Sequence, residues 1–194
     1  RLSRMSFSQT FVMSNKVREM KAKGINVISL TLGEPDFDVP DNIKKAAFKA
    51  IDDNFSHYSP VPGFLDLREA ICEKLKRDNN LDYHPAQICV SNGAKQSILN
   101  VLSSIINDGD EVILPAPYWV SYDEMVKMVG GKSVFIETSI ETDFKMTAAQ
   151  LEQTITPKTK ALLYSSPCNP SGSFYQYEEL EAIANVIAKY PHIT

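Results

Sequence analysis

The sequence has few cysteines, and those it has form no recognisable pattern. Cys72, Cys89 and Cys168 lie far apart, no Cys-x-x-Cys pair occurs, and their number is odd. This arrangement argues against a closed disulfide framework and predicts reduced thiols in a cytoplasmic protein. Long apolar runs are missing too, since none approaches the roughly 20 residues that a membrane-spanning helix needs. With 43% hydrophobic residues, the composition is typical of a globular protein.

Motifs of several other classes of protein are also absent. The three histidines, His57, His84 and His192, show no spacing typical of metal ligands. No Gly-x-Ser-x-Gly elbow or Walker lysine is present, and the scattered carboxylates suggest no glycosidase pair. The net charge is −4 and basic and acidic residues are interspersed, so no basic patch indicates nucleic acid. We therefore expect no metal, no nucleic acid and no membrane among the partners.

What the sequence does have is a regular alternation of strand and helix patterns. Before residue 87, a helix closed by Gly24, an extended segment at 27–30 and two amphipathic helices are expected. After it, strands alternate with helices, which predicts βαβ units, a mostly parallel sheet and an α/β fold. A capping box of Thr147 and Gln150 predicts a short additional helix. The expected strands are 87–90, 111–114, 133–136 and 160–164, and the main expected helices are 14–23, 94–106, 121–129 and 177–189.

The segment after the last of these strands is the most informative. It runs Tyr-Ser-Ser-Pro-Cys-Asn-Pro-Ser-Gly over residues 164–172 and precedes a helix. It therefore lies at the carboxyl edge of the sheet, where open α/β sheets bind ligands. Asn169 sits between Pro167 and Pro170, which restrict its backbone. Such an amide is suited to fixing a ligand oxygen, and the Asn169–Pro170 bond could be cis.

This segment resembles the Asn-Pro-x-Gly signature of class I aminotransferases, which depend on pyridoxal 5′-phosphate, and is most similar to bacterial aspartate aminotransferases. Four other family landmarks occur in the family order: Leu-Gly-Glu-Pro-Asp-Phe at 32–37, Tyr-Ser-Pro-Val-Pro-Gly at 58–63, Ser-Asn-Gly-Ala-Lys-Gln at 91–96 and Pro-Tyr-Trp at 117–119. The resemblance implies the three-layer α/β/α large domain of fold type I, truncated at its carboxyl end. Residues 1–40 would then be an amino-terminal arm and part of a small domain, and residues 41–194 part of the large domain.

The 91–97 segment is a candidate phosphate site in its own right. Small residues between a strand and a helix let backbone amides approach an anion at the positive end of the helix. An ordinary strand-to-helix turn explains the same residues, and the Lys95 side chain could be no more than a solvated charge. The family resemblance implies that Gly93, Ala94 and Lys95 bind the cofactor phosphate.

Two further residues have both a structural and a functional interpretation. Trp119, the only tryptophan, could be a core aromatic residue. The resemblance implies instead that its ring stacks on the cofactor pyridine. Asn169 could satisfy its own turn, whereas the resemblance implies that it donates to the phenolic oxygen of the cofactor and tunes the pKa of the internal Schiff base. Both residues would also contact the substrate.

The remaining two candidates depend on the resemblance alone. Tyr58 lies beside prolines and Gly33 in a turn, so packing and turn formation would explain them. In the family, the tyrosine reaches the phosphate of the partner subunit's cofactor, which implies a homodimer with a shared active site. Gly33 would bring backbone to the substrate carboxylate.

The resemblance also implies residues that lie downstream of the Asn-Pro-x-Gly block. These are a Schiff-base lysine beyond Thr194, an acidic partner of the pyridine nitrogen and two arginines. We therefore interpret the chain as an amino-terminal half, with no catalytic residue of its own and no activity alone. The implied reaction moves an amino group between an amino acid, aspartate in the first instance, and a 2-oxo acid such as 2-oxoglutarate.

Three alternatives remain open. The substrate could be that of an aromatic, alanine or prephenate aminotransferase. The chain could belong to a non-catalytic regulator that senses the cofactor. A generic phosphate-binding α/β domain would explain residues 87–110 but not the ordered landmarks.

Overall fold

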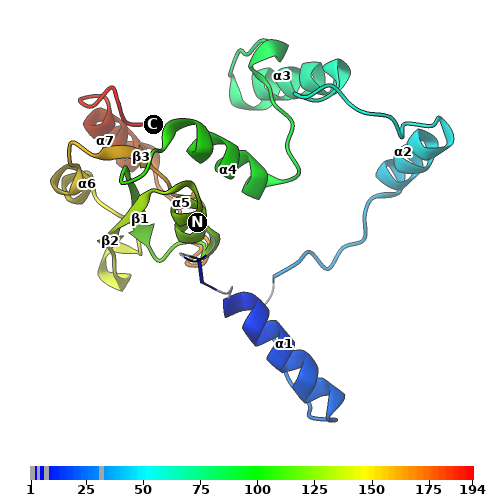
Figure 1. The fold of residues 1–194 in the computed structure, drawn as a ribbon, viewed down its shortest axis with the longest axis horizontal. Coiled ribbons are helices and arrows are strands. Elements are labelled where there is room, and N and C mark those ends of the chain that lie inside the picture. Colours follow the sequence, from blue (N-terminus) through cyan, green and yellow to red (C-terminus); the bar gives the residue numbers. More distant parts are fainter. Residues whose placement is uncertain (1–2, 4, 7–8, 31–32) are drawn as a thin grey trace. The chain divides into compact units, whose positions relative to one another are not determined.

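The computed structural model describes residues 3, 5–6, 9–30 and 33–194 (Figure 1). The chain forms two units. One comprises Ala94–Thr194 together with the chain up to Gln9, and the other comprises Thr10–Gly93. The first unit contains the sheet of the described chain and both of its hydrophobic clusters, so it carries the core.

The sheet has three parallel strands in the order β2-β1-β3. They are β1 (Glu111–Ala116), β2 (Lys132–Glu137) and β3 (Thr159–Leu162). Val112, Ile113 and Leu114 of the central strand are completely buried, because helices cover both faces of a parallel sheet. The expected βαβ alternation and parallel sheet are thus confirmed.

Successive side chains of β1 point to opposite faces and enter two separate clusters. Val112 and Leu114 pack against α4 (Ala94–Ile105) and α5 (Ser121–Val129), with Leu102, Tyr122 and Val126 among the contacts. Ile113 packs on the other face.

On the other face of the sheet, Ile113 packs against α6 (Ala148–Thr154) and α7 (Tyr177–Ile187). The contacting residues of these helices are Leu151, Ile183 and Val186. Helices therefore lie on both faces of the sheet, in three layers (Figure 1). This is the expected α/β/α arrangement.

Local signals explain where several of these elements begin and end. The Thr147 hydroxyl accepts from the Gln150 amide while the Gln150 side chain accepts from the Thr147 amide, so the expected capping box starts α6. The 3₁₀ turn η3 (Ile140–Thr142) ends at Asp143 in the left-handed region. The expected helix at 121–129 is found as α5, which ends at Gly130, also left-handed.

The other unit consists of helices and loops. Its elements are α1 (Gln9–Ala22), α2 (Asp41–Asp52), α3 (Leu65–Asn79) and the 3₁₀ turn η2 (Pro85–Gln87). The helix α1 begins five residues before the expected Ser14 and ends just ahead of Gly24, whose φ is +76°. No residue of α2 or α3 is buried, so this unit has no core of its own among the described residues.

One predicted strand is wrong. Residues 87–90 read as strand from their apolar alternation, but the structure has the η2 turn followed by irregular chain. The Val90 amide donates to the Pro62 carbonyl at 3.0 Å rather than to a neighbouring strand. Local β propensity does not make a strand without a ladder partner. Within residues 3, 5–6, 9–30 and 33–194, no helix is long and apolar enough to cross a bilayer.

Candidate active site

The carboxyl edge of the sheet brings two of the predicted loops together. The Pro117–Trp119 segment follows β1, and the 163–172 segment follows β3, its parallel neighbour. Parallel neighbours end at the same edge. The Cys168 thiol lies 3.5 Å from the Pro117 carbonyl, to which it donates. The loops that carry Trp119 and Asn169 are therefore in direct contact, although the contacting residues are 51 positions apart in the sequence.

The Trp119 ring has two defined neighbours. Tyr122 meets it edge to face, with ring centroids 5.5 Å apart and an angle of 86° between the planes. The Lys95 ammonium lies 5.1 Å from the ring centroid, within the range of a cation–π contact. Lys95 lies at the start of α4, and its ammonium group contacts the Trp119 ring. The Lys95 side chain is thus more than a solvated charge.

The start of α4 also presents backbone donors. Ala94 is the first residue of this helix, and the first amides of a helix lack partners within it. Gly93, immediately before it, has a φ of +83°, and a Cβ built there would have no atom within 4 Å. The backbone therefore turns into the helix next to open space, a shape and polarity that suit a phosphate group.

Asn169 lies in a closed loop. The Gly172 amide donates to the Cys168 carbonyl at 2.8 Å, and the Cys168 amide donates to the Ser173 carbonyl at 2.7 Å. The backbone amide of Asn169 donates to the Ser165 hydroxyl at 3.3 Å, and Asn169 as a residue is exposed. The Asn169–Pro170 bond is cis, as are Ser166–Pro167 and Ala116–Pro117. The loop thus fixes the backbone of Asn169 and leaves its side chain open to a ligand.

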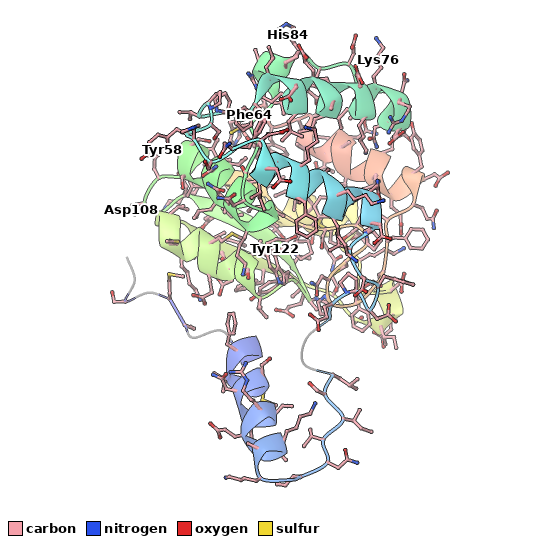
Figure 2. All side chains as sticks on the ribbon, turned by 90° about the vertical axis from the view of Figure 1, so that its right-hand side faces the viewer. Tyr58, Phe64, Lys76, His84, Asp108 and Tyr122 are labelled. Carbon is pink, nitrogen blue, oxygen red and sulfur yellow. The ribbon has the colours of Figure 1, made fainter. Side chains whose placement is uncertain are left out.

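Gly33 and Tyr58 belong to the unit formed by Thr10–Gly93. Tyr58 is fully exposed (Figure 2), in the loop that ends at Gly63. That loop is tied to the chain before Gly93 through the bond from Val90 to Pro62. Gly33 has no neighbour within 4 Å of a virtual Cβ. Leu32, the first residue of its motif, lies outside the described residues. The predicted roles of Gly33 and Tyr58 stay predictions.

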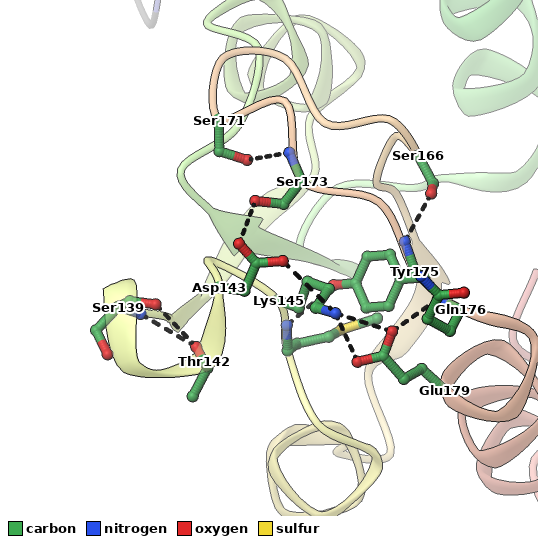
Figure 3. Close-up of polar contacts among 11 residues, drawn as sticks. Ser139, Thr142, Asp143, Lys145, Ser166, Ser171, Ser173, Tyr175, Gln176 and Glu179 are labelled. Atoms are coloured by element: carbon green, nitrogen blue, oxygen red, sulfur yellow. Dashed lines mark hydrogen bonds and ion pairs between the residues drawn. The ribbon is translucent and has the colours of Figure 1, made fainter.

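Sequence reasoning missed the residues that hold the Asn169 loop (Figure 3). The Ser173 hydroxyl donates to Asp143 at 3.2 Å, and the Tyr175 amide donates to the Ser166 hydroxyl at 3.0 Å. The Tyr175 hydroxyl accepts from the buried Met146 amide at 2.9 Å. Because Asp143 and Met146 lie about 30 positions before their partners in the sequence, no local pattern could have revealed those two contacts.

Burial and ion pairing shift several pKa values near this loop. Burial raises the pKa of Tyr175 and of Tyr164, which meet edge to face with centroids 5.3 Å apart. Both phenols are therefore neutral at pH 7. The hydrogen bond from Lys145, 2.7 Å from the nearer oxygen, lowers the pKa of the Glu179 carboxyl, and the same contact raises the pKa of Lys145. Within the described chain, no group of three His, Cys, Asp or Glu side chains could hold a metal ion.

Comparisons with known proteins identify the family of the chain. The family model described as aminotransferase class I and II matches residues 25–194. The aspartate/prephenate aminotransferase of Cereibacter sphaeroides is 50% identical over 192 residues, which are 99% of this chain and 48% of that protein. The corresponding protein of Nitrosomonas europaea is 50% identical over 186 residues, 96% of this chain and 47% of its own length.

Solved structures give the same result for the fold. The aspartate aminotransferase of Rhizobium meliloti superposes with a TM-score of 0.94 at 39% identity, covering 98% of this chain and 48% of that one. The aspartate aminotransferase of Thermus thermophilus with maleate gives 0.93 at 41% identity, over 97% of this chain and 49% of that one. The chain thus spans about half the length of the relatives that it matches. It belongs to the class I and II aminotransferases.

Proposed function

We propose that this chain forms part of the cofactor site of a pyridoxal-phosphate transaminase that acts on aspartate and a 2-oxo acid such as 2-oxoglutarate. The observation that carries the proposal is the gathering of Lys95, Trp119 and the Asn169 loop at one edge of the sheet. When bound, the cofactor supplies the electron sink that transamination requires. The residues of this chain bind and orient it.

Each of these groups fits one part of the cofactor. The amides of Gly93, Ala94 and Lys95 and the Lys95 ammonium suit the phosphate, because they combine backbone donors at a helix start with positive charge. The half-buried Trp119 ring offers a flat surface for the pyridine. The side-chain amide of the exposed Asn169 can donate to the phenolic oxygen of the cofactor, because hydrogen bonds within the loop fix the backbone of this residue.

The other two residues complete the proposal. The fully exposed Tyr58 side chain would reach the cofactor phosphate of a second subunit, which makes the enzyme a homodimer with a shared site. The Gly33 backbone, with open space beside it, would approach the substrate carboxylate. The expected cytoplasmic location fits the three free cysteines.

The choice of aspartate rests on the relatives. Two named above are aspartate/prephenate aminotransferases and two are aspartate aminotransferases, one of them solved with the dicarboxylate maleate. A second candidate substrate class is aromatic, because the aromatic aminotransferase of Pyrococcus horikoshii also superposes, with a TM-score of 0.82 at 42% identity over 89% of this chain and 47% of that one.

Two measurements test the proposal. The first compares initial rates of the full-length protein, because this chain alone is expected to be inactive. Pyridoxal phosphate and 2-oxoglutarate are supplied, and the amino donors are aspartate, phenylalanine, alanine and the amino acid formed by amination of prephenate. The highest rate is expected with aspartate. A rate with aspartate well below that with phenylalanine would favour the aromatic class instead, and no transamination of any donor would overturn the enzymatic proposal.

The second measurement follows binding directly. Trp119 is the only tryptophan, so its fluorescence reports a ligand at its own ring. Pyridoxal phosphate should quench this emission saturably, whereas pyridoxal without its phosphate should bind more weakly because it loses the α4 amides and Lys95. Equal affinities for the two compounds would contradict the assigned phosphate site.

A further inference from the structure

The backbone that carries Asn169 is fixed by a partner on the opposite arm of its loop. The Cys168 amide, one residue before Asn169, donates to the Ser173 carbonyl at 2.7 Å. The position of Ser173 therefore sets the position of Cys168, and with it the direction in which Asn169 leaves the loop.

Ser173 is itself held by Asp143. The Ser173 hydroxyl donates to Asp143 Oδ1 at 3.2 Å, across 30 positions of sequence (Figure 3). Ser173 is buried, while the Asp143 side chain is 69% exposed. The carboxylate thus reaches in from a surface turn to hold a buried hydroxyl of the loop.

The turn that presents Asp143 is itself well defined. Asp143 and Phe144 both have a φ of 53°, a left-handed conformation that only a few residue types adopt readily. Aspartate, asparagine and glycine are the residues that tolerate it best, which limits what can stand at position 143. Among these three, glycine alone offers Ser173 no acceptor.

The contact is separable from the ion pair beside it. Lys145 lies 2.7 Å from Glu179 but 3.7 Å from Asp143, so it keeps a closer partner when the Asp143 carboxylate is removed. Glu179 also accepts from the Gln176 amide at the start of α7. Loss of the Asp143 side chain should therefore leave α7 anchored and affect chiefly the loop.

We propose that Asp143 is a positioning residue for the cofactor site, which acts through Ser173 and Cys168 to orient Asn169 toward the phenolic oxygen of pyridoxal phosphate. This inference rests on the proposed function, because it gives Asn169 the role stated there. Asp143 touches neither cofactor nor substrate; its effect passes through the loop backbone.

The test compares four variants of the full protein: Asp143→Gly, Asp143→Asn, Ser173→Ala and the double variant Asp143→Gly/Ser173→Ala. Lys189→Gln is the matched control, because it removes a surface ion pair, Lys189 with Glu152 at 2.7 Å, that has no link to the loop. Asn169→Ala measures the full effect of losing the amide.

The readout is the pKa seen in the absorption spectrum of the protein-bound cofactor as pH is varied, because a hydrogen bond to the phenolic oxygen shifts that pKa. Asp143→Gly and Ser173→Ala should each shift it by about half a unit in the direction of Asn169→Ala, since a misaligned hydrogen bond is weakened but not lost. The double variant should shift it no further than either single one, because both remove the same contact. Asp143→Asn, which keeps the left-handed turn and an acceptor, should resemble wild type.

The outcomes separate this inference from the proposed function. If Asn169→Ala shifts the absorption pKa while Asp143→Gly and Ser173→Ala match Lys189→Gln, the positioning role is refuted and the proposed site stands. If Asn169→Ala itself causes no shift, the role of Asn169 fails and the inference with it. If both single variants fold, an additive shift in the double variant would overturn the shared contact. Should Asp143→Gly not fold, Ser173→Ala alone decides.

Discussion

Replacing Tyr175 by phenylalanine measures how firmly the chain after the Asn169 loop is tied to the segment before α6. The Tyr175 hydroxyl accepts from the Met146 amide at 2.9 Å, and both residues are buried. Phenylalanine keeps the ring and its edge-to-face contact with Tyr164 but leaves that amide without this acceptor. An unsatisfied buried donor costs about 1–3 kcal/mol, so the free energy of unfolding should fall by about that amount.

Urea denaturation of the full chain, followed by circular dichroism, gives this difference. Tyr177→Phe is the matched control, because Tyr177 is 74% exposed at the start of α7 and its loss should cost less than about 0.5 kcal/mol. Equal unfolding free energies for the two variants at pH 7 would refute the reasoning, since the buried hydroxyl would then contribute nothing.

The same variant carries a pH dependence of known sign. Burial raises the pKa of Tyr175 above its usual value of 10.0, so the native state holds the proton more tightly than the unfolded state does. The stabilisation is complete below pH 10 and is lost as the pH rises through the raised pKa. The difference between wild type and Tyr175→Phe should therefore shrink in alkaline solution, and a difference that grows there would contradict the assignment.

Three further perturbations follow from burial, charge and backbone geometry. Leu151→Ala, at a completely buried position of α6, should lower the free energy of urea unfolding by about 2–5 kcal/mol. Glu111→Gln should flatten the loss of stability as the pH falls below 4.5, the usual pKa of this carboxyl, because the hydrogen bond from Thr156 lowers that pKa and the stabilisation is lost as the pH falls through the lowered value. Gly63→Ala would place a Cβ 2.6 Å from Val90 at a φ of +99° and should speed hydrogen exchange of the Val90 amide, whereas Gly24→Ala, at a φ of +76° in open space, should not.

The sheet and its helices could be predicted because each signal was local. The apolar run at 111–114 reads as a buried strand, and the pattern at 121–129 gives α5 with the bounds found in the structure. The strand expected at 87–90 fails for a nonlocal reason, since the Val90 amide pairs with Pro62 in a loop. Strand formation requires a neighbour, and the sequence of one segment does not specify it.

The residues of the candidate site also divide into those that a local pattern indicates and those that depend on a nonlocal contact. Trp119 and Asn169 follow strands, so the rule that ligands bind at the carboxyl edge of a parallel sheet makes them candidates. Their roles came from the family resemblance, because a core aromatic residue and a turn asparagine explain the same positions. Asp143 and Ser173 were not selected, because their contact joins residues 30 positions apart and depends on a left-handed turn. Aspartate occurs in many other settings, so its presence at position 143 does not reveal that turn.

The pairing of β1 with β3 determines the relative position of the two loops that carry Trp119 and Asn169. Val112 lies opposite Ala161 and Ile113 opposite Leu162, and the Leu163 amide extends the pairing to the Ile113 carbonyl. A slip of one residue would move the Asn169 loop by about 3.3 Å along the strand, enough to break the contact of Cys168 with Pro117. It would also turn Ala161 away from the cluster that it shares with Val112 and Leu114. The buried core thus selects the register, and the register in turn sets the geometry of the proposed cofactor site.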